Sequence, residues 1–181
     1  MVKMQKRPGA NEYNPYYSTY INLLPDGDII HILEEQMKGT NHLLKDISNS
    51  EGHFRYAPNK WSIKEVIGHI ADTERIMGYR LLSIARGETV ALPGYNDDMY
   101  VLRAAFDKQS MQDLLENLTV VRQSTVHLLK SLDEEAWLQR GVANNSEVTV
   151  RALANIIAGH ELHHRQIIKE RYLSSDAYPS S

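Results

Sequence analysis

The sequence predicts an all-α protein built as a four-helix bundle, with an irregular N-terminal arm and short extra helical segments. Apolar residues recur at helical spacing in four long stretches, and the rest of the chain holds no convincing strand pattern. The 181 residues include no cysteine, so one apolar core has to hold the fold without disulfides. We therefore expect one domain in which four amphipathic helices pack together.

The chain divides into three predicted parts. Residues 1–25 form an arm whose prolines prevent a long helix, residues 26–175 form the bundle, and residues 176–181 form a flexible tail. Tyrosines usually pack, so the arm is expected to cover the end of the core, with a role in stacking on a substrate as the alternative. Its tyrosines are Tyr13, Tyr16, Tyr17 and Tyr20.

The first two long helices have clear boundaries. The first is expected over residues 28–48, with an aspartate as its N-cap. The second is expected over residues 62–86, because Ser62 and Glu65 form a capping box and Gly87 marks the end. Arg80 falls on its apolar face, where a buried guanidinium would need a carboxylate partner, and a structural role is expected for it.

Shorter pieces surround the third long helix. A short helix is predicted around residues 99–106, and residues 110–132 form a scaffold helix without an ionisable residue at its centre. Residues 133–138 are expected to make a further turn that buries Trp137. Residues 141–147 are expected to be a polar connection to the last helix.

The fourth long helix, residues 149–173, carries an H-E-x-x-H motif formed by His160, Glu161 and His164. Residues four apart lie one turn apart on the same face of a helix. Counting about 100° per residue places both histidines on the apolar stripe, and it places His69 on the apolar stripe of the second helix. Burying unpaired imidazoles costs roughly 1–3 kcal/mol each, a cost that a shared metal removes. The three histidines therefore predict a metal site.

Two other interpretations of the histidines have to be considered beside a metal site. A polar cluster hydrogen-bonded within the core explains the same pattern, and for His69 alone it is the simpler explanation. A zinc peptidase is disfavoured, because Ile167 and Glu170 stand where the extended metzincin motif requires glycine and histidine. The histidines expected to face solvent, because they lie opposite the apolar stripes, are His31, His42 and His127.

Bulk properties narrow the range of partners. A formal charge of −3 and a pI near 6.2 disfavour a nucleic-acid binder that neutralises phosphates. The longest apolar runs fall far short of a membrane span, and residues 1–11 lack the apolar core of a signal peptide. We expect a cytoplasmic protein that acts on neither nucleic acid nor a membrane.

Two blocks of the chain resemble the DinB superfamily of metal-binding bundles. They are W-S-I-K-E-V-I-G-H-I-A-D-T-E-R at residues 61–75 and G-H-E-L-H-H at residues 159–164. The resemblance covers most of the chain. It implies a bundle, often dimeric, in which one histidine of the second helix and an H-x-x-x-H pair of the last helix bind a divalent metal. On this sequence the implied ligands are His69, His160 and His164.

The resemblance implies a class of chemistry without fixing the reaction. Relatives include bacillithiol transferases and mycothiol-dependent maleylpyruvate isomerases, so we expect a metal-dependent transferase using a low-molecular-weight thiol, or a hydrolase, acting on a small molecule. One divalent ion per chain is expected, zinc or nickel first and manganese or iron as alternatives, in a homodimer. Glu161 and Asp72 are candidates for a general base or for orienting a ligand. The competing hypothesis is a non-enzymatic, metal-stabilised module that serves in interaction or a stress response.

Overall fold

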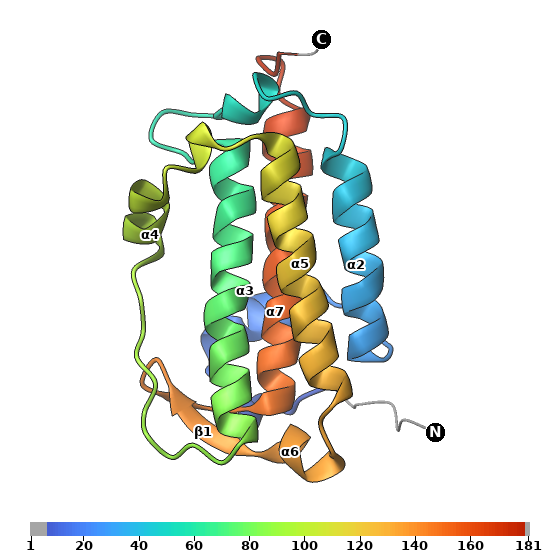
Figure 1. Cartoon of the computed structure of the whole chain (residues 1–181), viewed down its shortest axis with the longest axis vertical. Helices are drawn as coiled ribbons and strands as arrows, with labels where there is room; N and C mark the ends of the chain where they lie inside the picture. The colour runs from blue at the N-terminus through green and yellow to red at the C-terminus, as the bar shows by residue number, and fades with distance from the viewer. Residues whose placement is uncertain (1–6, 180–181) are drawn as a thin grey trace.

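The computed structural model describes residues 7–179, and its body is a bundle of four long helices (Figure 1). They are α2 (Ile29–Leu44), α3 (Ile63–Ala85), α5 (Met111–Lys130) and α7 (Val150–Ile167). In the view of Figure 1, α2 and α7 run upwards and α3 and α5 run downwards. α3 packs against α5 and α7, and α2 packs against the same two helices. The predicted all-α four-helix bundle is confirmed.

The helix ends lie within a few residues of the predicted ones, because local side chains cap them. Asp28 accepts hydrogen bonds from the backbone N–H groups of Ile30 and His31, both at 3.0 Å. Ser62 forms the predicted capping box at the start of α3, and Gly87 follows its end with a φ of 87°. α7 continues at Ile168 into a π-helix (Ile168–Leu173).

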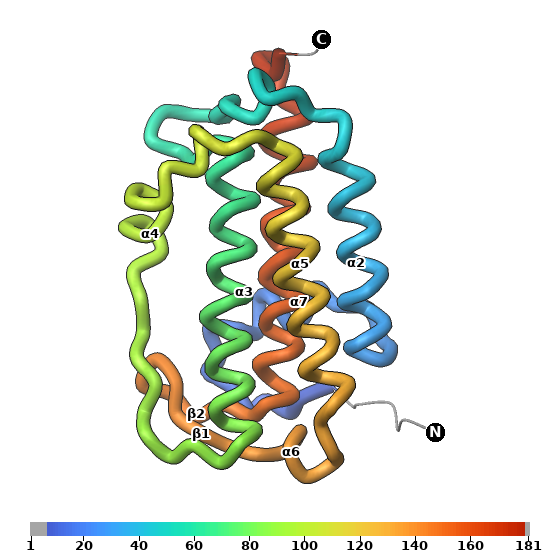
Figure 2. Tube along the Cα trace, viewed as in Figure 1, coloured from blue at the N-terminus to red at the C-terminus, as the bar shows by residue number. Residues whose placement is uncertain are grey.

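A long crossover joins α3 to α5, which is why these two neighbouring helices run in the same direction. It holds α4 (Asp97–Ala104) and a 3₁₀ turn (Phe106–Lys108). Figure 2 shows the crossover travelling the length of the bundle beside α3. After α5, the short helix α6 (Glu134–Leu138) buries Trp137 to 3% exposure, as predicted.

The predicted polar connection at residues 141–147 is wrong. The chain forms an antiparallel hairpin there, from β1 (Arg140–Ala143) and β2 (Ser146–Thr149). Asn144 and Asn145 make the turn with φ angles of 50° and 61°, a left-handed conformation that asparagine tolerates better than most residues. The turn lacks the glycine of the usual hairpin signal, so the sequence pattern did not reveal it.

The described part of the arm packs along α7. It forms two 3₁₀ turns (Ala10–Glu12 and Pro15–Tyr17) and the short helix α1 (Ser18–Ile21). The Glu12 carboxylate accepts hydrogen bonds from Arg151 Nε at 2.6 Å and Thr149 Oγ1 at 2.8 Å, at the start of α7. Residues 1–6 of the predicted arm and 180–181 of the predicted tail lie outside the described residues.

A layer of buried polar side chains separates two apolar clusters inside the bundle. One cluster gathers around Leu33, Leu81 and Leu153, and the other around Leu44, Ile67 and Leu114. We call the layer between them the polar belt. It consists of Gln36, Thr40, His69, Thr73, Glu74, Arg122, Thr125, His160 and Glu161. Among residues 7–179, no helix has both the length and the apolar character that crossing a membrane requires.

Candidate metal centre

The three predicted histidines meet at the polar belt, to which His69 and His160 belong. His69 comes from α3, and His160 and His164 come from successive turns of α7. The Nε2 atom of His160 lies 3.0 Å from that of His69 and 3.1 Å from that of His164. One ligand atom from each histidine lies within 4.8 Å of the other two. The predicted convergence is therefore found.

Burial keeps these imidazoles neutral. His69 and His160 are 4% and 8% exposed, and the indole of Trp61 lies over His69 with the ring centres 4.6 Å apart. Loss of hydration lowers the pKa of His69 to about 4 and that of His164 to about 3, and it lowers the pKa of His160 well below its ordinary value. At neutral pH each ring therefore presents a lone pair, which is the form that binds a metal.

Hydrogen bonding alone does not satisfy this trio. The His160 Nε2 atom faces both other Nε2 atoms, but it carries either one proton or one in-plane lone pair. A single proton or a single lone pair therefore has to serve both contacts, so at most one of them can be a well-directed hydrogen bond. Nitrogens that share one tetrahedral zinc lie about 3.3 Å apart, close to the observed spacing. The residues present fit a divalent ion.

A pocket of about 220 Å³ lies against His69 and His160. The arm contributes Tyr20, whose ring centre lies 5.6 Å from that of His160. The crossover contributes Tyr95, whose hydroxyl lies 2.8 Å from that of Thr73. The arm therefore does more than cover the core, because it forms one wall of this pocket. The other lining residues are Tyr16, Tyr17, Met77, Arg80, Asp97 and Asn144.

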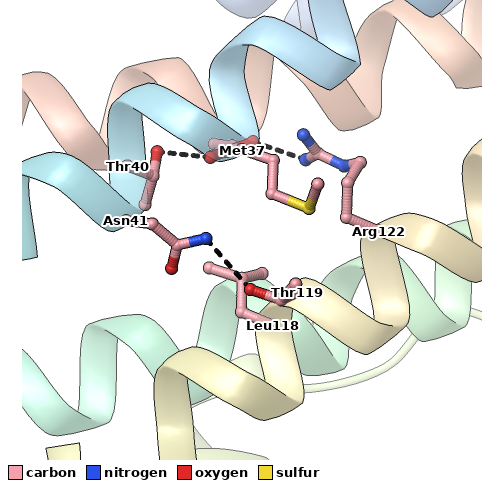
Figure 3. A pocket seen from close by; sticks show the side chains of 7 residues that line it. Met37, Thr40, Asn41, Leu118, Thr119 and Arg122 are labelled. Carbon is pink, nitrogen blue, oxygen red and sulfur yellow. Dashed lines mark hydrogen bonds and ion pairs between the residues drawn. The ribbon is translucent and has the colours of Figure 1, made fainter. Parts of the chain in front are cut away.

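The glutamate of the motif is hydrogen-bonded and ion-paired inside the bundle. Glu161 is 1% exposed, accepts a hydrogen bond from Thr40 Oγ1 at 2.5 Å, and forms an ion pair with Arg122. Arg122 also binds both oxygens of Glu74 at 2.9 Å and donates to the Leu33 carbonyl oxygen at 3.0 Å. Figure 3 shows Arg122 and Thr40 in this cluster, around a space too small for a water molecule.

Arg122 corrects the prediction that the third long helix has no ionisable residue at its centre. Glu161, a candidate general base, does not line the pocket of the histidines. Asp72, the other candidate base, is half-buried and pairs with Arg75 at 3.5 Å, and it does not line that pocket. Its partial burial raises the pKa of the carboxyl. The three histidines predicted to face solvent are exposed.

Asp97 is a pocket residue for which the sequence predicted no role of its own. It begins α4, and it is the only carboxylate among the described residues that line the pocket. Its charge acts on His69 and on Tyr20, in both cases favouring the protonated form. Asp97 and Tyr95 belong to the crossover, which has no apolar periodicity, so only the folded chain places them beside the histidines.

The chain is similar in sequence to known proteins. The family model of the DinB superfamily matches residues 32–168. A protein of Oceanobacillus iheyensis, provisionally named a metal-dependent hydrolase, is 25% identical over 146 residues, which cover 78% of this chain and 84% of that protein.

Two solved structures share the fold. YfiT from Bacillus subtilis, described as a probable metal-dependent hydrolase with an unusual four-helix bundle topology, superposes with a TM-score of 0.72 at 17% identity, over 92% of this chain and 91% of YfiT. A mycothiol-dependent maleylpyruvate isomerase superposes with a TM-score of 0.65 at 12% identity, over 80% of this chain and 61% of the isomerase. Since the superfamily match spans most of the chain, the protein belongs to the DinB superfamily.

Proposed function

We propose that the protein is a metal-dependent enzyme that acts on a small molecule in the pocket beside His69 and His160. The observation that carries this proposal is the meeting of three neutral Nε2 atoms beside an open pocket. The proposed ligands of one divalent ion are His69, His160 and His164, with zinc or nickel as the leading candidates. A divalent ion bound there would act as a Lewis acid, able to acidify water or to stabilise a thiolate.

The pocket residues have separate proposed roles. The three histidines hold the metal without reducing its charge, because they are neutral. Asp97 accepts the proton released in the reaction, because it is the carboxylate that reaches this pocket among the described residues. Tyr20 and Tyr95 enclose the substrate. Glu161 acts through His160 as a positioning residue, since its own oxygens bind Thr40 and Arg122.

Two reaction classes are proposed for testing. Hydrolysis is supported by the names given to the Oceanobacillus relative and to YfiT, and it needs only water as the second substrate. Transfer to a low-molecular-weight thiol is supported by the mycothiol-dependent isomerase of the same fold. Assays of ester and amide hydrolysis beside assays of thiol consumption distinguish the two classes.

Metal content tests the proposal directly. Untagged protein is expected to retain close to one divalent ion per chain after dialysis, and His160→Ala is expected to lose it. The matched control is His127→Ala, which removes an exposed histidine of α5 and is expected to keep the ion. A wild-type protein that took up no zinc, nickel or manganese would overturn the metal site.

The competing proposal is a non-enzymatic module that the metal stabilises. It is favoured by the engagement of Glu161, which leaves the motif without a free base. It predicts that metal raises the melting temperature while no substrate is turned over. The homodimer stays a prediction, and light scattering of the purified protein tests it.

A further inference from the structure

Arg80 is a buried cation without a carboxylate partner in the described part of the chain. It is 3% exposed, and it donates hydrogen bonds to the Pro93 carbonyl oxygen at 2.7 Å and to Met77 Sδ at 3.6 Å. Among residues 7–179, no carboxylate oxygen lies within 4.0 Å of its guanidinium. The carboxylate partner expected from the sequence is therefore not found there. Arg122, which is similarly buried, has two such partners.

A charge buried without a counter-ion is costly, and proteins usually avoid it. Its contacts with one carbonyl oxygen and one thioether sulfur satisfy only part of the five N–H donors of a guanidinium, and among the described residues no carboxylate contacts its charge. In the low-dielectric surroundings of the helix bundle, this charge attracts an anion more strongly than an exposed arginine does. The missing partner therefore points to an anionic ligand.

Arg80 borders two pockets. Together with Tyr95, it lines the pocket of the histidines and a neighbouring pocket of about 300 Å³. Arg80 lies eleven residues after His69 on α3, which is about 16 Å along the helix. A small molecule can therefore reach from the histidines to the guanidinium. The remaining walls of the neighbouring pocket are mostly apolar or aromatic and include Ile76, Tyr79, Leu92, Pro93 and Tyr100.

We propose that Arg80 binds a carboxylate or another oxyanion of the substrate, and that the neighbouring pocket receives its apolar or aromatic body. The planar guanidinium presents parallel N–H donors that match the oxygens of such a group. The reacting end of the molecule then lies at the histidines. This last step rests on the proposed metal-dependent function, whereas the oxyanion site rests on the burial and position of Arg80.

The probe is octanoate, compared with octanamide by isothermal titration calorimetry. The two molecules share an apolar chain and differ in charge. Octanoate is expected to bind at least about tenfold more tightly to the wild type. The same preference is expected in His160→Ala, because the guanidinium and not the metal recognises the carboxylate. A protein without metal would thus refute the proposed function while leaving the oxyanion site intact.

Arg80→Met is expected to remove the preference for octanoate while leaving octanamide binding unchanged. The matched control is Arg75→Met, which removes an exposed arginine from the neighbouring pocket and is expected to retain the preference. The melting temperature of Arg80→Met should be no lower than that of Arg75→Met, since Arg80→Met removes an unpaired buried charge. A purely structural Arg80, acting through Pro93, predicts a large loss of stability instead.

Three results would overturn the proposal: equal binding of octanoate and octanamide to the wild type, an undiminished preference in Arg80→Met, or an equal loss of preference in Arg75→Met. The comparison of octanoate with octanamide on the wild type needs no variant, so it can refute the oxyanion site even where Arg80→Met does not fold. Inorganic phosphate as a competitor of octanoate distinguishes a general oxyanion site from one selective for carboxylates.

Discussion

Replacing Arg122 by methionine is expected to cost a large part of the stability of the bundle. Arg122 is 1% exposed and pairs with both Glu74 and Glu161, which are 3% and 1% exposed. The substitution keeps an unbranched side chain of similar length while it removes the charge. Two carboxylates then remain inside the bundle without their cation, and the Leu33 carbonyl oxygen loses a donor.

The size of the effect follows from the partners that are lost. Removing one member of a buried ion pair typically costs about 3–5 kcal/mol, because the other charge stays buried. Here two carboxylates are left, so about 3–5 kcal/mol is a lower bound. A whole domain is stable by about 5–15 kcal/mol, and the loss corresponds to a fall in melting temperature of roughly 6–20 °C.

Urea and thermal unfolding followed by circular dichroism measure this loss. The control is Arg103→Met, which removes an exposed arginine of α4 and is expected to change stability by less than about 0.5 kcal/mol. The triple variant Glu74→Gln, Arg122→Met and Glu161→Gln is expected to regain most of the loss, because no uncompensated charge remains. An Arg122→Met protein within about 1 kcal/mol of wild type would refute the reasoning.

Four further substitutions have expected outcomes. Gly159→Ala should lower the free energy of unfolding by about 1–3 kcal/mol, because its Cβ would lie 2.4 Å from the Tyr20 carbonyl oxygen. At Gly78 an added Cβ has no neighbour within 4 Å, so Gly78→Ala should raise the free energy of unfolding by about 0.5–1 kcal/mol. Equal effects of the two substitutions in urea unfolding would contradict the packing of Tyr20 against Gly159. Asp97→Asn should lower kcat by about 10²-fold or more with unchanged metal content, and an unchanged kcat would remove its proposed role. Glu12→Gln should expose the arm to limited proteolysis, because its carboxylate ties the arm to the start of α7; cleavage no faster than in wild type would show that apolar contacts hold the arm.

The helices could be predicted because their signals are local. Apolar spacing and capping residues lie within each helix, so Ser62 and Gly87 mark the ends of α3 without knowledge of any other element. The histidine trio could be predicted for a related reason. Each histidine lies on an apolar stripe, and all apolar stripes of a bundle face the same core.

The ion cluster shows what the local pattern leaves out. Arg122 lies four residues after Leu118 and three before Thr125, so helical spacing does place it on the buried face. The role of a charged residue on such a face can be predicted only when its ion-pair partners are known. Those partners are Glu74 on α3 and Glu161 on α7, which only the packing of the helices brings together. The arm and the loop at residues 93–100 were candidates for pocket walls, with covering the core as the alternative, and the sequence could not place them beside the histidines because the crossover has no periodicity.

The same cluster gives the glutamate of the H-E-x-x-H motif a role different from that in a zinc peptidase. A metal site requires ligand atoms placed to within about 0.2 Å, whereas apolar helix faces alone permit small rotations and shifts. Glu161 ties α7 to Thr40 of α2 and, through Arg122, to α5 and α3. His160 is the residue directly before Glu161, so the bonds that fix the rotation of α7 also fix the position of His160 relative to His69. We therefore infer that the histidines of the motif supply the ligands, and that its glutamate sets their register within the bundle.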